Sequence, residues 1–292
     1  MERLKQYLLL ARLPNAFTAL SNVLAGYFSL TSPADVNILQ LSMLMASSTL
    51  LYISGIVFND YFYLEVDKKE RPNRPLPSGR IKKENALALA CATMAGAIAI
   101  AFAVSPASLA ISAALSAVIL AYDYGVKKGR LGPAAMGGAR FLNVILGASP
   151  ALGMFMPWST LFAAGTVFAY VISITILSRK EAGEQSDARK SVVQAFSVIV
   201  AITASMIAFA LYAKSLEMLV NIALFSAAML FTWGGTRSGT QAQIQNAVKN
   251  LVLFIIILDS AFITAFAGLP YGIASLAIMA PAVVLARRFY IT

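Results

Sequence analysis

A cluster of oxygen-bearing side chains between residues 59 and 67 has the spacing of a functional site. Asn59, Tyr63 and Asp67 are four residues apart, so a helix running through them would place all three on one face. Asp60 and Asp67 are seven apart and would share nearly the same side. Acids at the C-terminal end of a helix oppose its macrodipole, so helix stability does not explain them. Oxygen ligands of this kind suit a hard cation such as Mg²⁺.

Three arginines follow this cluster in a proline-rich segment. Arg71, Arg74 and Arg80 lie in the stretch R-P-N-R-P-L-P-S-G-R. Guanidinium groups pair well with phosphate oxygens, so acids and arginines together predict a site for a magnesium-bound diphosphate. The spacing alone leaves a second interpretation open, in which this is a solvated basic loop with incidental acids.

The composition indicates that lipid is part of the solvent of this chain. Of its 292 residues, 59% are hydrophobic and only 12% are charged, and the mean hydropathy is +0.74. A soluble domain carries about 25% charged residues. The chain has no histidine and one cysteine, Cys91. An internal disulfide is therefore excluded and a zinc site is not expected.

The apolar runs predict an all-α, polytopic transmembrane helical bundle of nine to ten spans forming a single domain over residues 1–292. A spanning helix needs about 20 mostly apolar residues. The candidate spans are 13–30, 38–58, 85–104, 107–122, 136–155, 158–177, 192–212, 217–234, 248–267 and 270–286.

The basic residues predict the orientation of these spans. If the N-terminus is cytoplasmic, 22 of the 23 Lys and Arg residues fall on the inner side, and only Lys214 falls outside. This bias predicts a plasma (inner) membrane protein with both termini in the cytoplasm. It also argues against nucleic acid as a partner, because the basic residues are spread among the inner loops.

A second polar loop, 178–191, lies on the same predicted side. Glu181, Glu184 and Asp187 are three residues apart, as on one face of a helix. Basic residues are interleaved with them, which would weaken metal binding.

These segments together resemble the UbiA superfamily of intramembrane prenyltransferases. The stretch N-D-Y-F-Y-L-E-V-D, followed by R-P-N-R-P-L-P-S-G, is similar to the first motif of that family. Loop 178–191 occupies the place of the second motif, and the resemblance covers about residues 8–267, so the last predicted span is extra to the family core. Further positions that resemble the family are Arg12, Pro14, Asn15, Asn22 and Gly26 in the first helix, and Tyr122, Lys127 and Lys128 after the fourth span.

The resemblance implies helices around a central cavity, and Mg²⁺-dependent transfer of a prenyl group from an allylic diphosphate to a lipophilic acceptor within the membrane. Two departures stand out. Tyr63 replaces the middle aspartate of the first motif, and the second motif keeps glutamates instead of its aspartates. With the stretch from Arg140 to Gly147, these features are similar to a divergent branch, the EboC-like proteins.

The resemblance also implies roles for individual residues. Asp60, Asp67 and Tyr122 are the candidate catalytic residues, although Tyr122 could equally be an interfacial tyrosine. The candidate metal ligands are Asn59, Asp60 and Asp67, with Glu181 and Glu184 for a second ion. The candidate substrate contacts are Asn22, Arg71, Arg74, Lys127, Lys128, Arg140 and Asn143.

The roles of two residues and the function of the protein remain open at this point. Asn22 could contact an acceptor or a neighbouring helix, and the mid-span Asp259 could be functional or structural. The lost aspartates leave room for a non-catalytic lipid- or isoprenoid-binding or transport protein on the same fold. A generic solute transporter is a third, weaker hypothesis.

Overall fold

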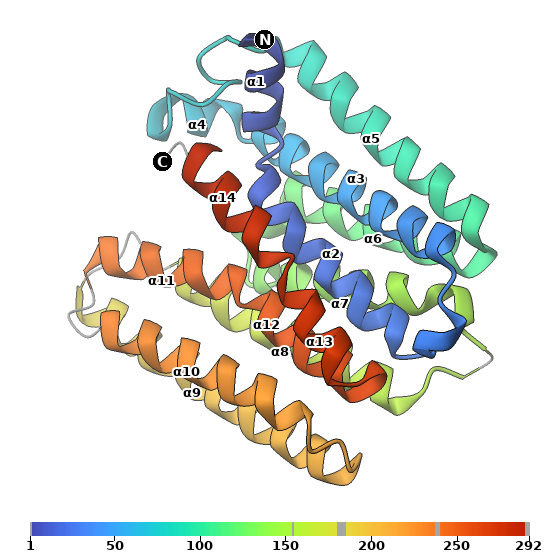
Figure 1. Ribbon diagram of the computed structural model, residues 1–292. Coiled ribbons are helices and arrows are strands. Elements are labelled where there is room, and N and C mark those ends of the chain that lie inside the picture. The colour runs from blue at the N-terminus through green and yellow to red at the C-terminus, as the bar shows by residue number, and fades with distance from the viewer. Residues whose placement is uncertain (1, 154, 180–184, 237–239, 290–292) are drawn as a thin grey trace.

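The computed structural model describes residues 2–153, 155–179, 185–236 and 240–289, which fold into helices joined by short connections (Figure 1). The α-helices are α1 (Glu2–Leu10), α2 (Leu13–Phe28), α3 (Ile38–Phe62), α4 (Leu64–Glu70), α5 (Lys83–Val104), α6 (Pro106–Tyr124), α7 (Gly132–Ala148), α8 (Trp158–Ser178), α9 (Gln185–Tyr212), α10 (Met218–Gly235), α11 (Gln241–Leu253), α12 (Ile255–Ala267), α13 (Leu269–Leu276) and α14 (Met279–Phe289). Three short 3₁₀ turns are η1 (Pro33–Asp35), η2 (Val126–Lys128) and η3 (Ser149–Ala151).

The prediction of an all-α membrane bundle is confirmed. Among the described residues, seven helices are long and apolar enough to cross a bilayer, and the bent pair of α1 and α2 could form an eighth span. The predicted spans 136–155 and 270–286 correspond to shorter helices, α7 and the pair of α13 and α14. Every predicted span therefore has a helical counterpart, although not every counterpart has the full length of a span.

One local prediction is wrong: the helix that carries Asn59 does not continue to Asp67. Helix α3 ends at Phe62, Tyr63 has φ −101° and ψ 16°, and α4 begins at Leu64. The chain changes direction at Tyr63, so the two motif aspartates lie on different helices.

Helix α2 runs through the middle of the bundle and packs closely on α7. A Cβ added to Gly147 would lie 2.1 Å from the carbonyl oxygen of Val23, and one added to Gly26 would lie 1.8 Å from that of Val144. Only glycine permits this backbone approach, which is common where helices meet in membranes. The contact fixes the side chains of α7 against those of α2.

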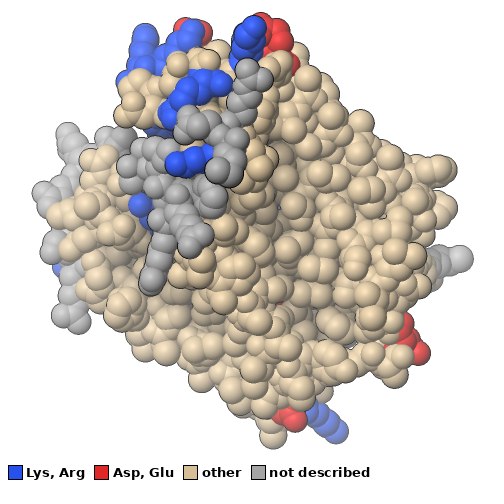
Figure 2. All heavy atoms as spheres, turned by 45° about the horizontal axis from the view of Figure 1, so that its top comes forward, with Lys and Arg blue, Asp and Glu red and all other residues tan. Residues whose placement is uncertain are grey.

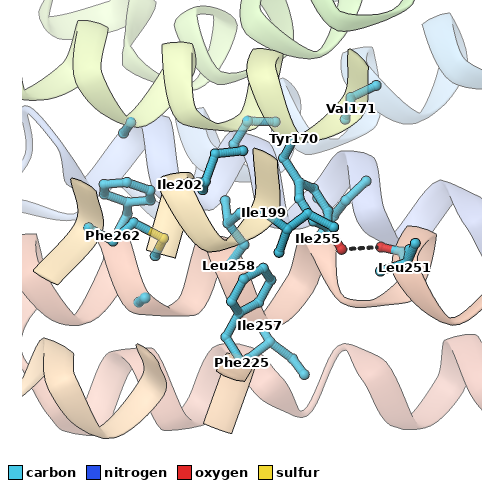
Figure 3. Packing of buried hydrophobic residues seen from close by; sticks show 14 of the residues in the cluster. Tyr170, Val171, Ile199, Ile202, Phe225, Leu251, Ile255, Ile257, Leu258 and Phe262 are labelled. Atoms are coloured by element: carbon cyan, nitrogen blue, oxygen red, sulfur yellow. Dashed lines mark hydrogen bonds between the residues drawn. The ribbon is translucent and has the colours of Figure 1, made fainter. Parts of the chain in front are cut away.

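The second half of the chain forms a packed core around Tyr170 of α8. Its hydroxyl donates to the carbonyl oxygen of Leu251, 2.8 Å away, and the centre of the Phe225 ring lies 5.6 Å from that of its own ring (Figure 3). This core joins α8 to α10, α11 and α12, while the walls of the cavity described below come mostly from α2, α3, α6 and α7.

Charged side chains are concentrated at one end of the molecule. Figure 2 shows Lys and Arg gathered there, above a broad surface with few charges. The opposite end carries Lys214 and Glu217, in the turn between α9 and α10. An uncharged belt between two polar ends is what a lipid bilayer requires.

Candidate active site

A cavity of about 330 Å³ opens near the basic end of the bundle and reaches into its first half. Arg12, Asn59, Tyr122, Asp123 and Lys127 line its mouth. Further along the same helices the walls are largely apolar, with Leu51 and Ile56 from α3, Leu115 and Ile119 from α6, and Met136 from α7. The cavity therefore joins a charged entrance to an apolar interior.

The two motif aspartates converge on one arginine beside this mouth. Nη1 of Arg74 lies 3.5 Å from Oδ1 of Asp60 and 2.9 Å from Oδ2 of Asp67. Arg12 also donates to Asp60. Both carboxylates are almost fully buried, at 1% and 4% exposed, so their charge must be compensated within the protein. The two acids lie on either side of the break at Tyr63, and both reach Arg74.

Arg12 reaches Asp60 from an unusual backbone position. It joins α1 to α2 with φ 45° and ψ 48°, in the left-handed region that residues other than glycine rarely adopt. The two helices meet there at 54°. The sequence analysis placed Arg12 in the first helix but gave it no role. Its contact with Asp60 makes it part of the site.

A second polar group joins three elements at the mouth. Asn59 at the end of α3 donates to Oδ1 of Asp123 on α6, 2.7 Å away, and Nζ of Lys127 in η2 donates to Oδ1 of Asn59, 3.1 Å away. Lys127 and Lys128 also stack over the ring of Tyr63, with Nζ 4.3 and 5.0 Å from its centroid. Tyr63 thus holds two lysines by cation–π attraction, where a carboxylate would have held them by charge.

Burial changes the titration of the basic side chains outside the spans. Desolvation lowers the pKa of Lys127, because the surroundings disfavour its charged form, and Asp123 partly opposes this. Burial also lowers the pKa of Arg74, against the attraction of Asp60 and Asp67. An anion bound at the mouth would stabilise the charged forms of Lys127 and Arg74.

The donors at the mouth fit a single hard cation. Asp60 and Asp67 both lie within 3.5 Å of one nitrogen of Arg74, so a cation in place of that nitrogen could contact both. These oxygen donors suit Mg²⁺. Within the described ranges, however, no three acidic, histidine or cysteine side chains group together as a metal site. Glu181 and Glu184, the predicted ligands of a second ion, lie outside the described residues.

The remaining predicted residues fall in three places. Tyr122, Arg140 and Asn143 line the cavity, and Arg71 and Lys128 are exposed beside its mouth. Asn22 lies behind the cavity wall with no exposed surface, where it donates to Asp259 and accepts from Arg140. Of its two predicted roles, the described contacts support the one with neighbouring helices.

Asp123 is the site residue that sequence reasoning missed. It is 3% exposed and bonded to Asn59. The sequence feature that marked Asp60 also marks Asp123: each is an acid at the C-terminal end of an apolar helix.

Comparison with known proteins identifies the family. The model of the UbiA prenyltransferase family matches residues 19–255. Digeranylgeranylglyceryl phosphate synthases from Methanocaldococcus jannaschii and Ignicoccus hospitalis are each 38% identical to this chain, over 86 and 93 residues. These matches cover 30% and 32% of this chain and only 30% and 29% of the relatives' lengths.

Solved structures share the fold over nearly the whole chain. A structure of digeranylgeranylglyceryl phosphate synthase superimposes with a TM-score of 0.68 at 20% identity, covering 92% of this chain and all of that one. A UbiA homologue from Archaeoglobus fulgidus, bound to DMAPP and Mg²⁺, gives 0.66 at 15% identity, covering 93% of this chain and 99% of that one. The chain belongs to the UbiA prenyltransferase family and is an integral, multi-pass membrane protein.

Proposed function

We propose that this protein is a membrane prenyltransferase that moves a prenyl group from an allylic prenyl diphosphate to a lipophilic acceptor. The observation that carries the proposal is the cavity itself, where buried carboxylates and basic side chains surround the mouth of an apolar interior. A prenyl diphosphate has the matching form, with a charged head and a hydrocarbon tail. Family membership and partial identity to the synthases support the same conclusion.

The residues at the mouth account for donor binding. Asp60 and Asp67 would hold one Mg²⁺, which when bound neutralises charge on the leaving diphosphate. Arg12 and Arg74, which now pair with these acids, would turn to the phosphate oxygens. Lys127 and Lys128 are held beside the same mouth by Tyr63 and would contact the phosphates from the opposite side.

Transfer then breaks the bond between C1 and oxygen of the donor. The acceptor forms a bond to C1 and loses a proton, and diphosphate leaves. The apolar walls would keep water from the allylic cation. Tyr52 and Tyr122, which line the cavity, could each stabilise that cation by about 0.5–2 kcal/mol. We further propose that the basic end faces the cytoplasm, in the plasma membrane.

Binding of donor by the purified protein tests the site. Prenyl diphosphates of several lengths would be titrated with Mg²⁺ or with EDTA into the wild type, Asp67→Ala and Glu65→Ala. Glu65 is the matched control, because it is an exposed acid two residues away on α4 that pairs with Lys68. We expect Mg²⁺-dependent binding that Asp67→Ala weakens at least tenfold and Glu65→Ala leaves intact. Equal binding by all three would place the donor elsewhere.

The alternative function is a non-catalytic isoprenoid- or lipid-binding protein. The pairing of both motif aspartates with arginines, and Tyr63 at the motif's middle position, favour it. It predicts tight prenyl diphosphate binding without transfer to any lipid acceptor.

A further inference from the structure

A second pocket lies at the basic end of the bundle, between α1 and the start of α5 (Figure 1). Its volume is about 380 Å³, and it shares no lining residue with the cavity of the candidate active site. Its walls are Tyr7 of α1, then Gly79, Arg80 and Ile81 of the loop before α5, then Lys82 and Asn85 at the start of α5. The proposed prenyl transfer makes no use of this pocket.

The loop that forms one wall of the pocket is anchored in the core. Ile81 is buried and belongs to the same apolar cluster as Leu76 and Leu10. Its backbone N–H donates to the carbonyl oxygen of Pro75, 3.1 Å away. Gly79, with φ 74°, allows the chain to turn between these contacts. The pocket is therefore a fixed part of the fold.

The two basic side chains in the pocket wall have no acidic partner in the described part of the chain. Neither Arg80 nor Lys82 forms an ion pair there. Arg80 donates to Oγ of Ser78, 2.8 Å away, and to the carbonyl oxygen of Asn73, which leaves other N–H groups of its guanidinium for a ligand. No side chain caps the first turn of α5, so its N–H groups add partial positive charge. Such donors together suit a phosphate group.

The pocket lies at the level that lipid headgroups would occupy. The candidate span in α5 begins at Lys83, and only 22% of its apolar window is buried, so most of this helix faces lipid. Ala88 and Ala92, on the same face of α5 as Asn85, are exposed. Tyr7, in the opposite wall, is of a residue type that is common at the membrane interface. A lipid with its headgroup in the pocket would have its acyl chains along α5.

We propose that this pocket binds the phosphate of an anionic membrane lipid. Arg80, Lys82 and the first N–H groups of α5 bind the phosphate oxygens, and the acyl chains lie on the exposed face of α5. Basic pockets between helices on the cytoplasmic side are suited to such headgroups. A soluble phosphate shares the headgroup chemistry but lacks the chains. This inference does not depend on the proposed transferase function, because the two sites have no residue in common.

Lipid binding to the detergent-solubilised protein tests the headgroup site. Phosphatidylglycerol, phosphatidylcholine and glycerol phosphate would each be titrated into the wild type, Lys82→Gln and Lys69→Gln, and bound molecules counted by native mass spectrometry. Lys69 is the matched control, because it is an exposed lysine of α4 that does not line the pocket. We expect the wild type to prefer phosphatidylglycerol, Lys82→Gln to weaken its binding about fivefold, and Lys69→Gln to leave it unchanged.

Two outcomes of this titration would overturn the proposal. Equal losses in the two lysine variants would mean that the lipid responds to the general charge of this end and not to the pocket. Glycerol phosphate binding as tightly as phosphatidylglycerol would assign the pocket to a soluble phosphate. The double variant Arg80→Gln and Lys82→Gln should lose more phosphatidylglycerol binding than Lys82→Gln alone, since both cations contact the phosphate.

The single cysteine of the chain allows the position of the lipid to be tested. Cys91 is exposed on α5, nine residues after Lys82 and therefore about 13 Å further along the helix. A fluorophore attached to Cys91 would be measured in phosphatidylcholine vesicles that contain a minor fraction of brominated phosphatidylglycerol or brominated phosphatidylcholine. We expect stronger quenching by the brominated phosphatidylglycerol, an excess that Lys82→Gln removes and Lys69→Gln keeps. Equal quenching by the two brominated lipids in the wild type would contradict a lipid site beside α5.

Discussion

At the scale of single residues, the site is a set of buried charges that compensate one another. Asp60 and Asp67 are 1% and 4% exposed, and Arg74 contacts both. Buried carboxylates without a partner are strongly destabilising. The same carboxylates are the best oxygen donors at the mouth, so a metal cation could take the place of the Arg74 guanidinium between them. We therefore expect electrostatic compensation at this position to link protein stability to metal binding.

Replacing Arg74 should expose this link. Arg74→Gln leaves two buried acids short of a partner, so we expect the melting temperature to fall, by a destabilisation of about 3–5 kcal/mol. Mg²⁺ should recover more stability in this variant than in the wild type, because it can take the vacated position. Thermal unfolding with and without Mg²⁺ measures both effects. Arg80→Gln is the control, because Arg80 is exposed and bonds to Ser78 and the Asn73 carbonyl. Equal Mg²⁺ responses in the two variants would argue against a cation site at Asp60 and Asp67.

Lys127 should give diphosphate binding a pH dependence. Burial lowers the pKa of Lys127, so it loses its proton at a lower pH than an ordinary lysine. Only the protonated form attracts phosphate. Affinity for inorganic diphosphate should therefore be full below this lowered pKa and fall as pH rises through it.

The variant Lys127→Arg, which does not titrate in that range, should flatten the alkaline decline. Lys128→Arg is the matched control, since Lys128 is the exposed lysine over the same ring of Tyr63. A decline that persists in Lys127→Arg would assign the titration to another group.

Much of this site follows from residue spacing, and the exceptions have physical reasons. The spacing placed Asp60 and Asp67 together, which their shared contact with Arg74 confirms. The expected reason, one continuous helix, is wrong because α3 ends at Phe62. Contacts such as that between Asn59 and Asp123 depend on how α3 meets α6, which local spacing cannot determine.

At the scale of elements, the contact between α2 and α7 sets the positions of Arg140 and Asn143 in the cavity wall. Gly26 and Gly147 let the two backbones approach, and Asn143 then donates to the carbonyl oxygen of Ala19 at 2.9 Å. The sequence shows several glycines and alanines in both helices. It could not predict which glycines meet a backbone, because that depends on how the two helices pack together.

Two glycines of α7 provide a matched test of this contact. Gly147→Ala puts a methyl group 2.1 Å from the carbonyl oxygen of Val23, so we expect a loss of about 1–3 kcal/mol or failure to fold. Gly138→Ala meets nothing within 4 Å and should be neutral or stabilising by about 0.5–1 kcal/mol. Thermal unfolding in detergent compares them. Similar losses in both variants would mean that the close approach does not matter.

At the scale of the whole molecule, most of the basic side chains and the candidate active site lie at the same end. Lys and Arg gather there (Figure 2), and the mouth of the cavity lies among them. The hydropathy of the sequence predicted the bundle, because a bilayer imposes long apolar helices. The segment Gln241–Ala267, which contains α11 and α12 with a short break at Phe254, counts as one span, in agreement with its hydropathy.

The proposed orientation can be tested with two exposed serines. In a Cys91→Ser background, Ser32→Cys lies in the turn between α2 and α3, and Ser78→Cys in the basic loop. In right-side-out bacterial membrane vesicles we expect a membrane-impermeant maleimide to label Ser32→Cys, and to label Ser78→Cys only after permeabilisation. The opposite pattern would invert the topology.

The central claim is that this cavity transfers a prenyl group. The most direct measurement incubates purified protein with Mg²⁺, labelled prenyl diphosphates of several lengths and a membrane lipid extract, and follows label in the extracted lipids. We predict a labelled product with the wild type and with Glu65→Ala, and none with Asp67→Ala. Tight donor binding with no labelled product from any donor would contradict enzymatic function and favour the non-catalytic alternative.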